Sequence, residues 1–404
     1  MKKKALAASA VFSAMALTLS ACAQAPDQSS SSASPAASAS GKPASGDFKA
    51  CIVSDSAGFT DKSFNQTSLA GLEKAATDLK INTAKVESKD DKDYAVNIQS
   101  MVDAKCTIIV SVGFLLEKAT VAAAKANPNI DFAIVDSQPE GAPSNLKPLI
   151  FNTAESSFMA GYLAAALTKT GKVGTFGGMK IPTVTIFMDG YAQGVDYYNT
   201  QKKKSVQVLG WDAKKQDGLF VPQPNPFQNV AGGKTTAQTL INQGADIVLP
   251  VAGNAGNGAL QVVKSSGGKA NAIWVDADGC NTQPNYCSSI ITSVYKGMDV
   301  AVYDAIKAAK DGSFSGTPYV GSLADGGTGL SPFHTFDSKI PADPVDEAGP
   351  AGDLMAPPGP GAGAGPTERG RISPWQMSQP RTRRRPHRWP RGSACAESPS
   401  GSAD

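Results

Sequence analysis

The stretch Cys106-Thr-Ile-Ile-Val-Ser-Val112 decides the fold, because this short apolar run predicts a strand buried on both faces of a sheet. Apolar residues spaced three and four apart predict a helix on either side of it, at residues 94–102 and 115–126. The same signals predict a further helix at residues 69–79 and strands at residues 49–54, 83–86 and 132–135. This β-α-β-α-β-α-β order is typical of a parallel sheet with helices on both faces.

The alternation of helices and strands restarts in the following part of the chain. Helices are expected at residues 157–168, 184–198, 234–243 and 258–265, and strands at residues 173–176, 205–209, 247–251 and 272–275. Two α/β units of similar length predict two lobes with a ligand cleft between them. We assign residues 47–153 with 290–320 to the first lobe, and residues 154–289 with 321–340 to the second.

Polar residues follow several predicted strands, at the edge where open α/β sheets bind their ligands. In the first unit these are Asp55, the run Ser111-Val-Gly113 and Asp136, and in the second they are Gly253 and Asp276. Carboxylates accept hydrogen bonds from hydroxyl groups, so this set predicts a site for a small polyhydroxyl ligand. An aspartate after a strand can instead cap the next helix, and that alternative stays open for each of them.

The N-terminus carries the signals of an exported protein. Lys2-Lys3-Lys4 precede an apolar stretch from Ala5 to Leu19, and Ser20-Ala21-Cys22 follow. This pattern resembles a bacterial lipoprotein signal, which implies that residues 1–21 are removed and that lipid on Cys22 anchors the protein to the outer face of the cell membrane. A plain secretory signal with an incidental cysteine is the alternative. Residues 22–46, mostly Ser, Ala, Pro and Gly, predict a flexible tether.

Charge divides the chain into a near-neutral body and a basic tail. Residues 47–340 contain 26 lysines and 27 acidic residues, a balance that argues against nucleic acid as a partner. All eight arginines lie between Arg369 and Arg391. Residues 341–404 also hold 12 of the 27 prolines, so we interpret this segment as a disordered tail that is out of frame or fused.

The cysteines of the body suggest disulfides, as is usual in an exported protein. Cys280 and Cys287 delimit a short loop that one disulfide can close. Cys51 and Cys106 lie near the starts of two predicted strands, which are neighbours in a sheet of order 2-1-3, so a second bridge is plausible. A zinc site would need further ligands, and the only histidines are His334 and His387, so we expect no metal.

The run Asp55-Ser-Ala-Gly58-Phe-Thr-Asp61-Lys-Ser63-Phe64-Asn65 resembles the signature of the basic membrane protein family, the purine-nucleoside receptor lipoproteins of bacterial import systems. Agreement continues from about Phe48 to Ile340, for instance in Gly177-Gly178-Met179 and Val275-Asp276-Ala-Asp278. The resemblance implies a two-lobed α/β fold of the periplasmic-binding-protein-like (type I) class. It further implies a monomeric solute-binding protein that delivers a nucleoside to an ABC permease, with no cofactor and no enzymatic activity.

The resemblance also implies a set of ligand-binding residues. Phe64 matches the first aromatic that stacks on the purine base, and Asn65 lies beside it. Asp55 and Asp136 match polar contacts from the first lobe, and Gly253, Asp276 and Lys296 match contacts from the second lobe and the hinge. For the second stacking aromatic, Phe227 aligns best by its distance to Gly253, and Trp211 is the alternative.

Three other functions remain open from the sequence. A nucleoside-processing enzyme would have to use Asp276 with Asp278, because no histidine precedes His334 in the body to serve as a base. A ligand sensor would share the fold but signal to a kinase in place of a permease. A binder of sugars or other small polar ligands would need only one aromatic face, whereas two favour a nucleoside.

Overall fold

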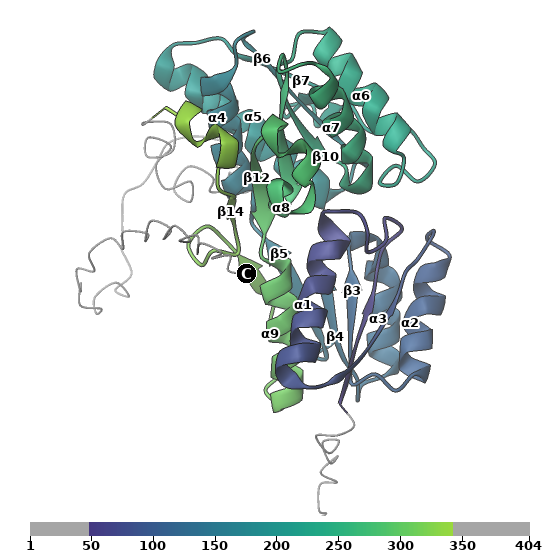
Figure 1. The fold of residues 1–404 in the computed structure, drawn as a ribbon. Helices are drawn as coiled ribbons and strands as arrows, with labels where there is room; N and C mark the ends of the chain where they lie inside the picture. Colours follow the sequence, from purple (N-terminus) through teal and green to yellow (C-terminus); the bar gives the residue numbers. More distant parts are fainter. Residues whose placement is uncertain (1–47, 342–404) are drawn as a thin grey trace, which may run out of the picture. The chain divides into compact units, whose positions relative to one another are not determined.

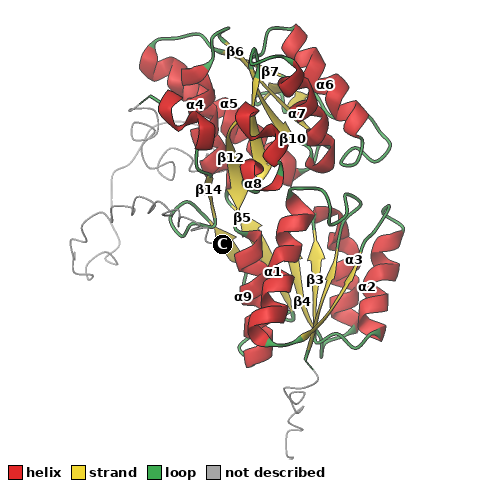
Figure 2. Cartoon of the chain, in the orientation of Figure 1, coloured by secondary structure: helices red, strands yellow, loops and turns green. Residues whose placement is uncertain are grey.

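The computed structural model describes residues 48–341, all of which belong to one compact unit. Within it, two six-stranded sheets each carry helices on both faces (Figures 1 and 2). Cys22, the signal at 1–21, the tether at 22–46 and the tail beyond Pro341 lie outside the described residues. Among the residues that are described, no helix is both long enough and apolar enough to cross a membrane.

The first sheet, with its helices, is called the first lobe. Its strand order is β13-β5-β4-β3-β1-β2, and all of its pairings are parallel. Its strands are β1 (Lys49–Val53), β2 (Asn82–Val86), β3 (Ile108–Val112), β4 (Asp131–Val135), β5 (Leu146–Phe151) and β13 (Tyr319–Gly321). Its helices are α1 (Phe64–Leu79), α2 (Asp93–Asp103), α3 (Glu117–Ala126) and α9 (Met298–Asp311).

The second sheet and its helices form the second lobe. Its order is β14-β12-β11-β10-β6-β7, parallel except for the edge strand β14. The strands are β6 (Lys172–Gly177), β7 (Gln207–Leu209), β10 (Ile247–Val251), β11 (Asn271–Asp276), β12 (Ile290–Lys296) and β14 (Thr328–Leu330), with a small ribbon of β8 (Trp211–Asp212) and β9 (Asp217–Gly218). The helices are α4 (Thr153–Leu167), α5 (Pro182–Lys202), α6 (Val230–Asn242), α7 (Gly256–Ser265) and α8 (Gly279–Thr282).

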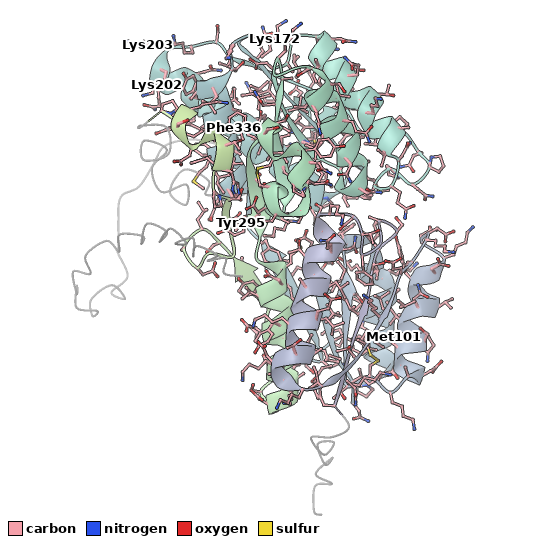
Figure 3. All side chains as sticks on the ribbon, viewed as in Figure 1. Met101, Lys172, Lys202, Lys203, Tyr295 and Phe336 are labelled. Atoms are coloured by element: carbon pink, nitrogen blue, oxygen red, sulfur yellow. A yellow bond between two sulfur atoms is a disulfide. The ribbon has the colours of Figure 1, made fainter. Side chains whose placement is uncertain are left out.

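The pleat of β1 explains why the first sheet is covered on both faces. Ala50 and Ile52 pack into the core beneath α1 and α9, whereas Cys51 and Val53 pack into the core beneath α2 and α3. Successive strand side chains point to opposite faces, so an unbroken apolar run is what two cores require. Met101 of α2, labelled in Figure 3, belongs to the second of these cores. The α/β fold predicted from the sequence is therefore confirmed.

One boundary predicted from the sequence is wrong. Residues 290–320 were assigned to the first lobe, but β12 pairs with β11 and β14 and so belongs to the second sheet. Ile291 and Val294 fill the core of the second lobe, which fixes the strand there. The chain therefore crosses back only after Lys296, and α9 then packs beside α1 in the first lobe (Figure 1). The other crossings follow β5 and β13.

Both disulfides suggested by the sequence are present. Cys51 of β1 is bonded to Cys106, just before β3, with 5.9 Å between their Cα atoms. The two strands are neighbours in the sheet, as the predicted order requires. Cys280 of α8 is bonded to Cys287 of the short 3-10 helix Pro284–Ser289, which follows it.

Candidate functional site

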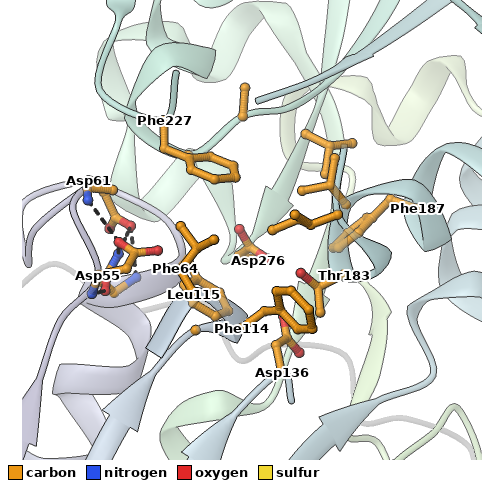
Figure 4. Close-up of a pocket in the computed structure, with 18 of the residues that line it drawn as sticks. Asp55, Asp61, Phe64, Phe114, Leu115, Asp136, Thr183, Phe187, Phe227 and Asp276 are labelled. Carbon is orange, nitrogen blue, oxygen red and sulfur yellow. Dashed lines mark hydrogen bonds between the residues drawn. The ribbon is translucent and has the colours of Figure 1, made fainter. Parts of the chain in front are cut away.

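A cavity lies between the carboxyl ends of the two sheets, and both lobes line it (Figure 4). Its empty volume is about 530 Å³, including the solvent at its mouth. All eight ligand-binding residues predicted from the sequence line this cavity: Asp55, Phe64, Asn65, Asp136, Phe227, Gly253, Asp276 and Lys296. The cavity is thus the meeting point of the strand ends that the sequence singled out.

The first end of the cavity is a buried hydrogen-bond network at the start of α1, formed by Asp55, Asp61, Ser63 and Asn65 and called here the helix-start network. The carboxylate of Asp61 accepts from the backbone N–H groups of Ser63 at 3.1 Å, Asn65 at 2.8 Å and Gln66 at 3.0 Å, and so caps the helix. The side-chain amide of Asn65 donates to Asp55 at 2.7 Å and to Asp61 at 3.1 Å. The network fixes where Asp55 and Phe64 lie.

Asp55 faces the cavity in an unusual electrostatic environment. Burial raises the pKa of its carboxyl group to about 7, and the nearby charges of Asp61 and Asp276 act in the same direction. The hydrogen bonds from the Ala57 N–H, at 2.8 Å, and from Asn65 oppose that shift. Near neutral pH this carboxyl group can therefore either accept a hydrogen bond from a ligand or donate one.

The other end of the cavity is an ion-pair cluster of Lys296, Asp136 and Asp276, called here the cross-lobe cluster. The Lys296 ammonium is paired with Asp136, and it lies 3.3 Å from Asp276. The three side chains are only 3%, 6% and 9% exposed. Burial alone would lower the pKa of Lys296, but the two carboxylates outweigh it and raise that pKa, so the ammonium stays charged. Because Asp136 follows β4 and Lys296 ends β12, the cluster joins the lobes.

Aromatic rings surround this charge. The Lys296 ammonium lies 4.9 Å from the ring centroids of both Phe64 and Phe187, which is within cation–π range. Gly113 forms the wall behind Phe64, and an added Cβ there would come within 3.3 Å of Asp55 and 3.4 Å of Phe64. The cavity therefore combines flat apolar faces with a buried, paired charge.

The structure decides which aromatic of the second lobe reaches the cavity. Phe227 lines it, and its ring packs so closely on Gly178 that an added Cβ would lie 2.4 Å from the ring. Trp211 instead belongs to the core of the second lobe, where its indole N–H donates to Asp189 at 2.9 Å. Phe227, and not Trp211, faces the first lobe across the cavity (Figure 4).

Several lining residues were not identified from the sequence. Phe114 follows Gly113 directly after β3, so the rule that ligands bind at strand ends could have found it. Thr183 and Phe187 lie in the first turns of α5, within a helix that the sequence located but whose cavity-facing side it did not resolve. Nothing in the apolar pattern distinguishes Phe187 from an ordinary core residue.

The two carboxylates that an enzyme would have to use do not act as a pair. Asp276 lines the cavity, where its Oδ2 accepts from the Ser63 hydroxyl at 2.6 Å. Asp278 caps α8 by accepting from the Cys280 N–H at 2.9 Å, and it also contacts His334 at 2.8 Å. The chain therefore turns between them, and only one of the two faces the cavity.

Comparisons with known proteins agree with this geometry. Residues 48–341 match the sequence model of the family described as ABC transporter substrate-binding protein PnrA-like. The chain is 32% identical to the ABC transporter nucleoside-binding protein BmpA of Lactococcus lactis over 349 residues, covering 82% of this chain and 92% of that protein. It is 31% identical to basic membrane protein A of Borreliella burgdorferi over 246 residues, covering 60% of this chain and 67% of that protein.

Solved structures share the fold. An ABC transporter solute-binding protein from Aeropyrum pernix matches with a TM-score of 0.63 and 26% identity, over 76% of this chain and 85% of that one. The arabinose-binding protein AraP from Geobacillus stearothermophilus matches with a TM-score of 0.51 and 15% identity, over 73% of this chain and 100% of that one, which is a likeness of fold alone. The family resemblance and the two-lobed binding-protein fold inferred from the sequence are therefore confirmed.

Proposed function

This chain belongs to the family of PnrA-like ABC transporter substrate-binding proteins, and we propose that it binds a nucleoside between its lobes and delivers it to an ABC permease. The similarity to a protein named as nucleoside-binding supports this ligand class. The observation that carries the proposal is one cavity in which aromatic rings from both lobes meet a buried lysine–carboxylate cluster. A nucleoside has a flat base and a sugar with hydroxyl groups, which match these two parts.

The purine or pyrimidine base occupies the space between Phe64 of the first lobe and Phe227 of the second. A ring face attracts any base, and stacking contributes about 1–3 kcal/mol per base. Asp55 lies beside Phe64 and meets the polar edge of the base, where its carboxyl group can accept from or donate to a ring nitrogen. Asn65 holds Asp55 in place through its side-chain amide.

The sugar occupies the end of the cavity that the cross-lobe cluster forms. Neighbouring hydroxyl groups donate to the carboxylates of Asp136 and Asp276, and the Lys296 ammonium donates to their oxygens. Gly253 gives the ligand close access to the backbone, because it has a φ of +52° and lacks a side chain. Since these residues belong to both lobes, a bound sugar favours the arrangement in which the lobes are in contact.

The remaining parts of the proposal concern the setting of the protein. We propose an extracytoplasmic monomer that a lipid on Cys22 holds at the cell membrane, beside the permease. The family match covers residues 48–341, so a role as a substrate-binding subunit accounts for all of them, and we propose no enzymatic step. Metabolic labelling with a palmitate analogue tests the anchor, and a Cys22→Ser variant that is still labelled would overturn it.

Calorimetry tests the ligand. Adenosine should bind the protein more tightly than adenine or ribose, because different residues hold the base and the sugar. In a parallel thermal measurement, adenosine at 100 times its dissociation constant should stabilise the protein by about 2.7 kcal/mol. Ribose that bound as tightly as adenosine would identify a sugar-binding protein instead, and an absence of binding to adenosine, guanosine, cytidine and uridine alike would overturn the proposal.

A further inference from the structure

A second opening adjoins the cavity and is called here the outer groove. Its empty volume is about 980 Å³, including open solvent. Phe114, Asp136 and Thr183, which lie together at one side of the cavity in Figure 4, also line the groove and so form the boundary between the two spaces. The groove is open to solvent at Val320, which is 53% exposed. The stacking aromatics Phe64 and Phe227 line only the inner cavity.

The lining of the groove is mixed, and its polar part carries acidic groups. Its apolar side chains are Phe114, Ile150, Phe151, Pro182, Ile186 and Val320, and its polar ones are Glu117, Asp136, Ser137, Gln138, Asn152, Thr153 and Thr183. The Ser137 hydroxyl donates to Glu117, which holds that carboxylate at the groove. Among the described residues that line it, none is a lysine, arginine or histidine. The Lys296 ammonium, which pairs with Asp136 at the border of the groove, is already engaged by two carboxylates.

We propose that the outer groove is a subsite for an uncharged, hydroxyl- or amide-bearing substituent on the sugar of the ligand, and that it excludes phosphate. This inference rests on the proposed function. Asp136 binds the sugar and also borders the groove, so the sugar end of the ligand points towards it. The neighbouring hydroxyls at C2′ and C3′ meet the carboxylates, which leaves C5′ as the position that enters the groove.

The charge of the groove lining favours binding of an uncharged substituent over binding of a phosphate. Glu117 repels a phosphate dianion, and the Lys296 ammonium is shared by Asp136 and Asp276, so it leaves no positive charge for a phosphate. The N-terminus of α5 at Pro182 also borders the groove and favours oxygen atoms. Proline at this position has no N–H to donate, which weakens the site for an anion. A hydroxyl or amide group suits both features, because it donates to the carboxylates and offers its oxygen to the helix.

The test compares three probes on the full chain by calorimetry: adenosine, its uncharged 5′-N-ethylcarboxamide and adenosine 5′-monophosphate. We expect the carboxamide to bind within about threefold of adenosine, and the monophosphate to bind at least about thirtyfold more weakly. Glu117→Gln keeps the hydrogen bond to Ser137 but removes a charge, so it should improve binding of the monophosphate roughly fivefold.

Val320→Trp fills the groove from an exposed position and should weaken the carboxamide about tenfold while it leaves adenosine unchanged. Val300→Trp, at a valine that is 56% exposed and lines neither space, is the matched control and should change the affinity of neither ligand.

If adenosine binds but the carboxamide does not, or if Val320→Trp weakens both ligands equally, the subsite is overturned. A monophosphate that binds as well as adenosine overturns the exclusion of phosphate. Failure of adenosine, guanosine, cytidine and uridine alike to bind overturns the proposed function, which is a separate result.

Discussion

The two ends of the cavity are built in opposite ways. The helix-start network belongs to the first lobe alone, and hydrogen bonds from backbone and side chains within the same segment satisfy its carboxylates. The cross-lobe cluster takes Asp136 from the first lobe and Lys296 and Asp276 from the second. The first end therefore keeps its shape if the lobes separate, whereas the second exists only while they are in contact. The base should therefore meet a preformed surface on the first lobe, which Phe227 covers on closure, and the sugar should meet a surface assembled by closure.

Lys296→Met should give the largest effect, because it leaves two buried carboxylates without a cation. Removal of one partner of a buried ion pair costs about 3–5 kcal/mol, so we expect a loss of adenosine affinity of at least about 100-fold by calorimetry. The free energy of unfolding, measured in urea, should change less than the free energy of adenosine binding, since Asp136 and Asp276 regain water when the lobes separate. Lys125→Met, at an exposed position of α3, is the control. An affinity within threefold of the unmodified protein would show that the cluster does not hold the ligand.

The pH dependence of stability should reveal the helix-start network. Burial raises the pKa of Asp55 to about 7, above its value of about 3.9 in an unfolded chain. Between these values the folded state binds more protons than the unfolded state, so this stabilising contribution is complete below about pH 4 and is lost as pH rises through about 7. The free energy of unfolding should fall by at most about 1.4 kcal/mol per pH unit from this group.

Asp55→Asn keeps an oxygen acceptor for Ala57 but removes the titration. The variant should therefore show a flatter dependence of unfolding free energy on pH between about 4 and 7. Asp61 contributes a slope of the same sign, because burial raises its pKa too, and that slope remains in the variant. Urea denaturation at several pH values measures the difference. Identical slopes in the two proteins would mean that Asp55 is hydrated and that the network is not as closed as its hydrogen bonds indicate.

The two aromatics test whether the base contacts both lobes equally. Phe64→Ala and Phe227→Ala should each weaken adenosine binding by roughly tenfold, the effect of a lost stacking face of about 1–3 kcal/mol. Trp211→Phe keeps an aromatic core residue outside the cavity and should leave affinity unchanged. Calorimetry with adenosine and ribose separates the contributions, since ribose has no base to stack. If Phe227→Ala has no effect while Phe64→Ala does, the base rests on the first lobe alone.

The sequence predicted which residues line the cavity better than it predicted the path of the chain between the lobes. The strand-end rule found Asp55 and Asp276 as residues of the cavity, because they follow strands of the repeated β-α pattern, and the family resemblance found Phe64. The sequence missed β12 and its lobe, since Ile290–Lys296 mixes apolar and polar residues without a strand period and gives no sign of the sheet to which it belongs. It also missed Phe187, because a phenylalanine on a helix gives no sign of whether it faces a core or a cavity.

Ser63 connects the two ends of the cavity, and its replacement should give the smallest effect. Its backbone N–H donates to Asp61 at 3.1 Å within the helix-start network, whereas its hydroxyl donates to Asp276 of the other lobe at 2.6 Å. Ser63→Ala removes this bond and the longer contact of the same hydroxyl with the Val275 carbonyl at 3.3 Å, and a single hydrogen bond contributes about 0.5–1.5 kcal/mol. We therefore expect adenosine affinity to fall about fivefold while the free energy of unfolding stays nearly constant, because the backbone cap is intact and the lost bond belongs to the closed arrangement. Ser265→Ala, at an exposed position of α7, controls for the loss of a hydroxyl. Equal losses in affinity and in stability would instead show that the bond persists without ligand, and then the second end of the cavity would be as preformed as the first.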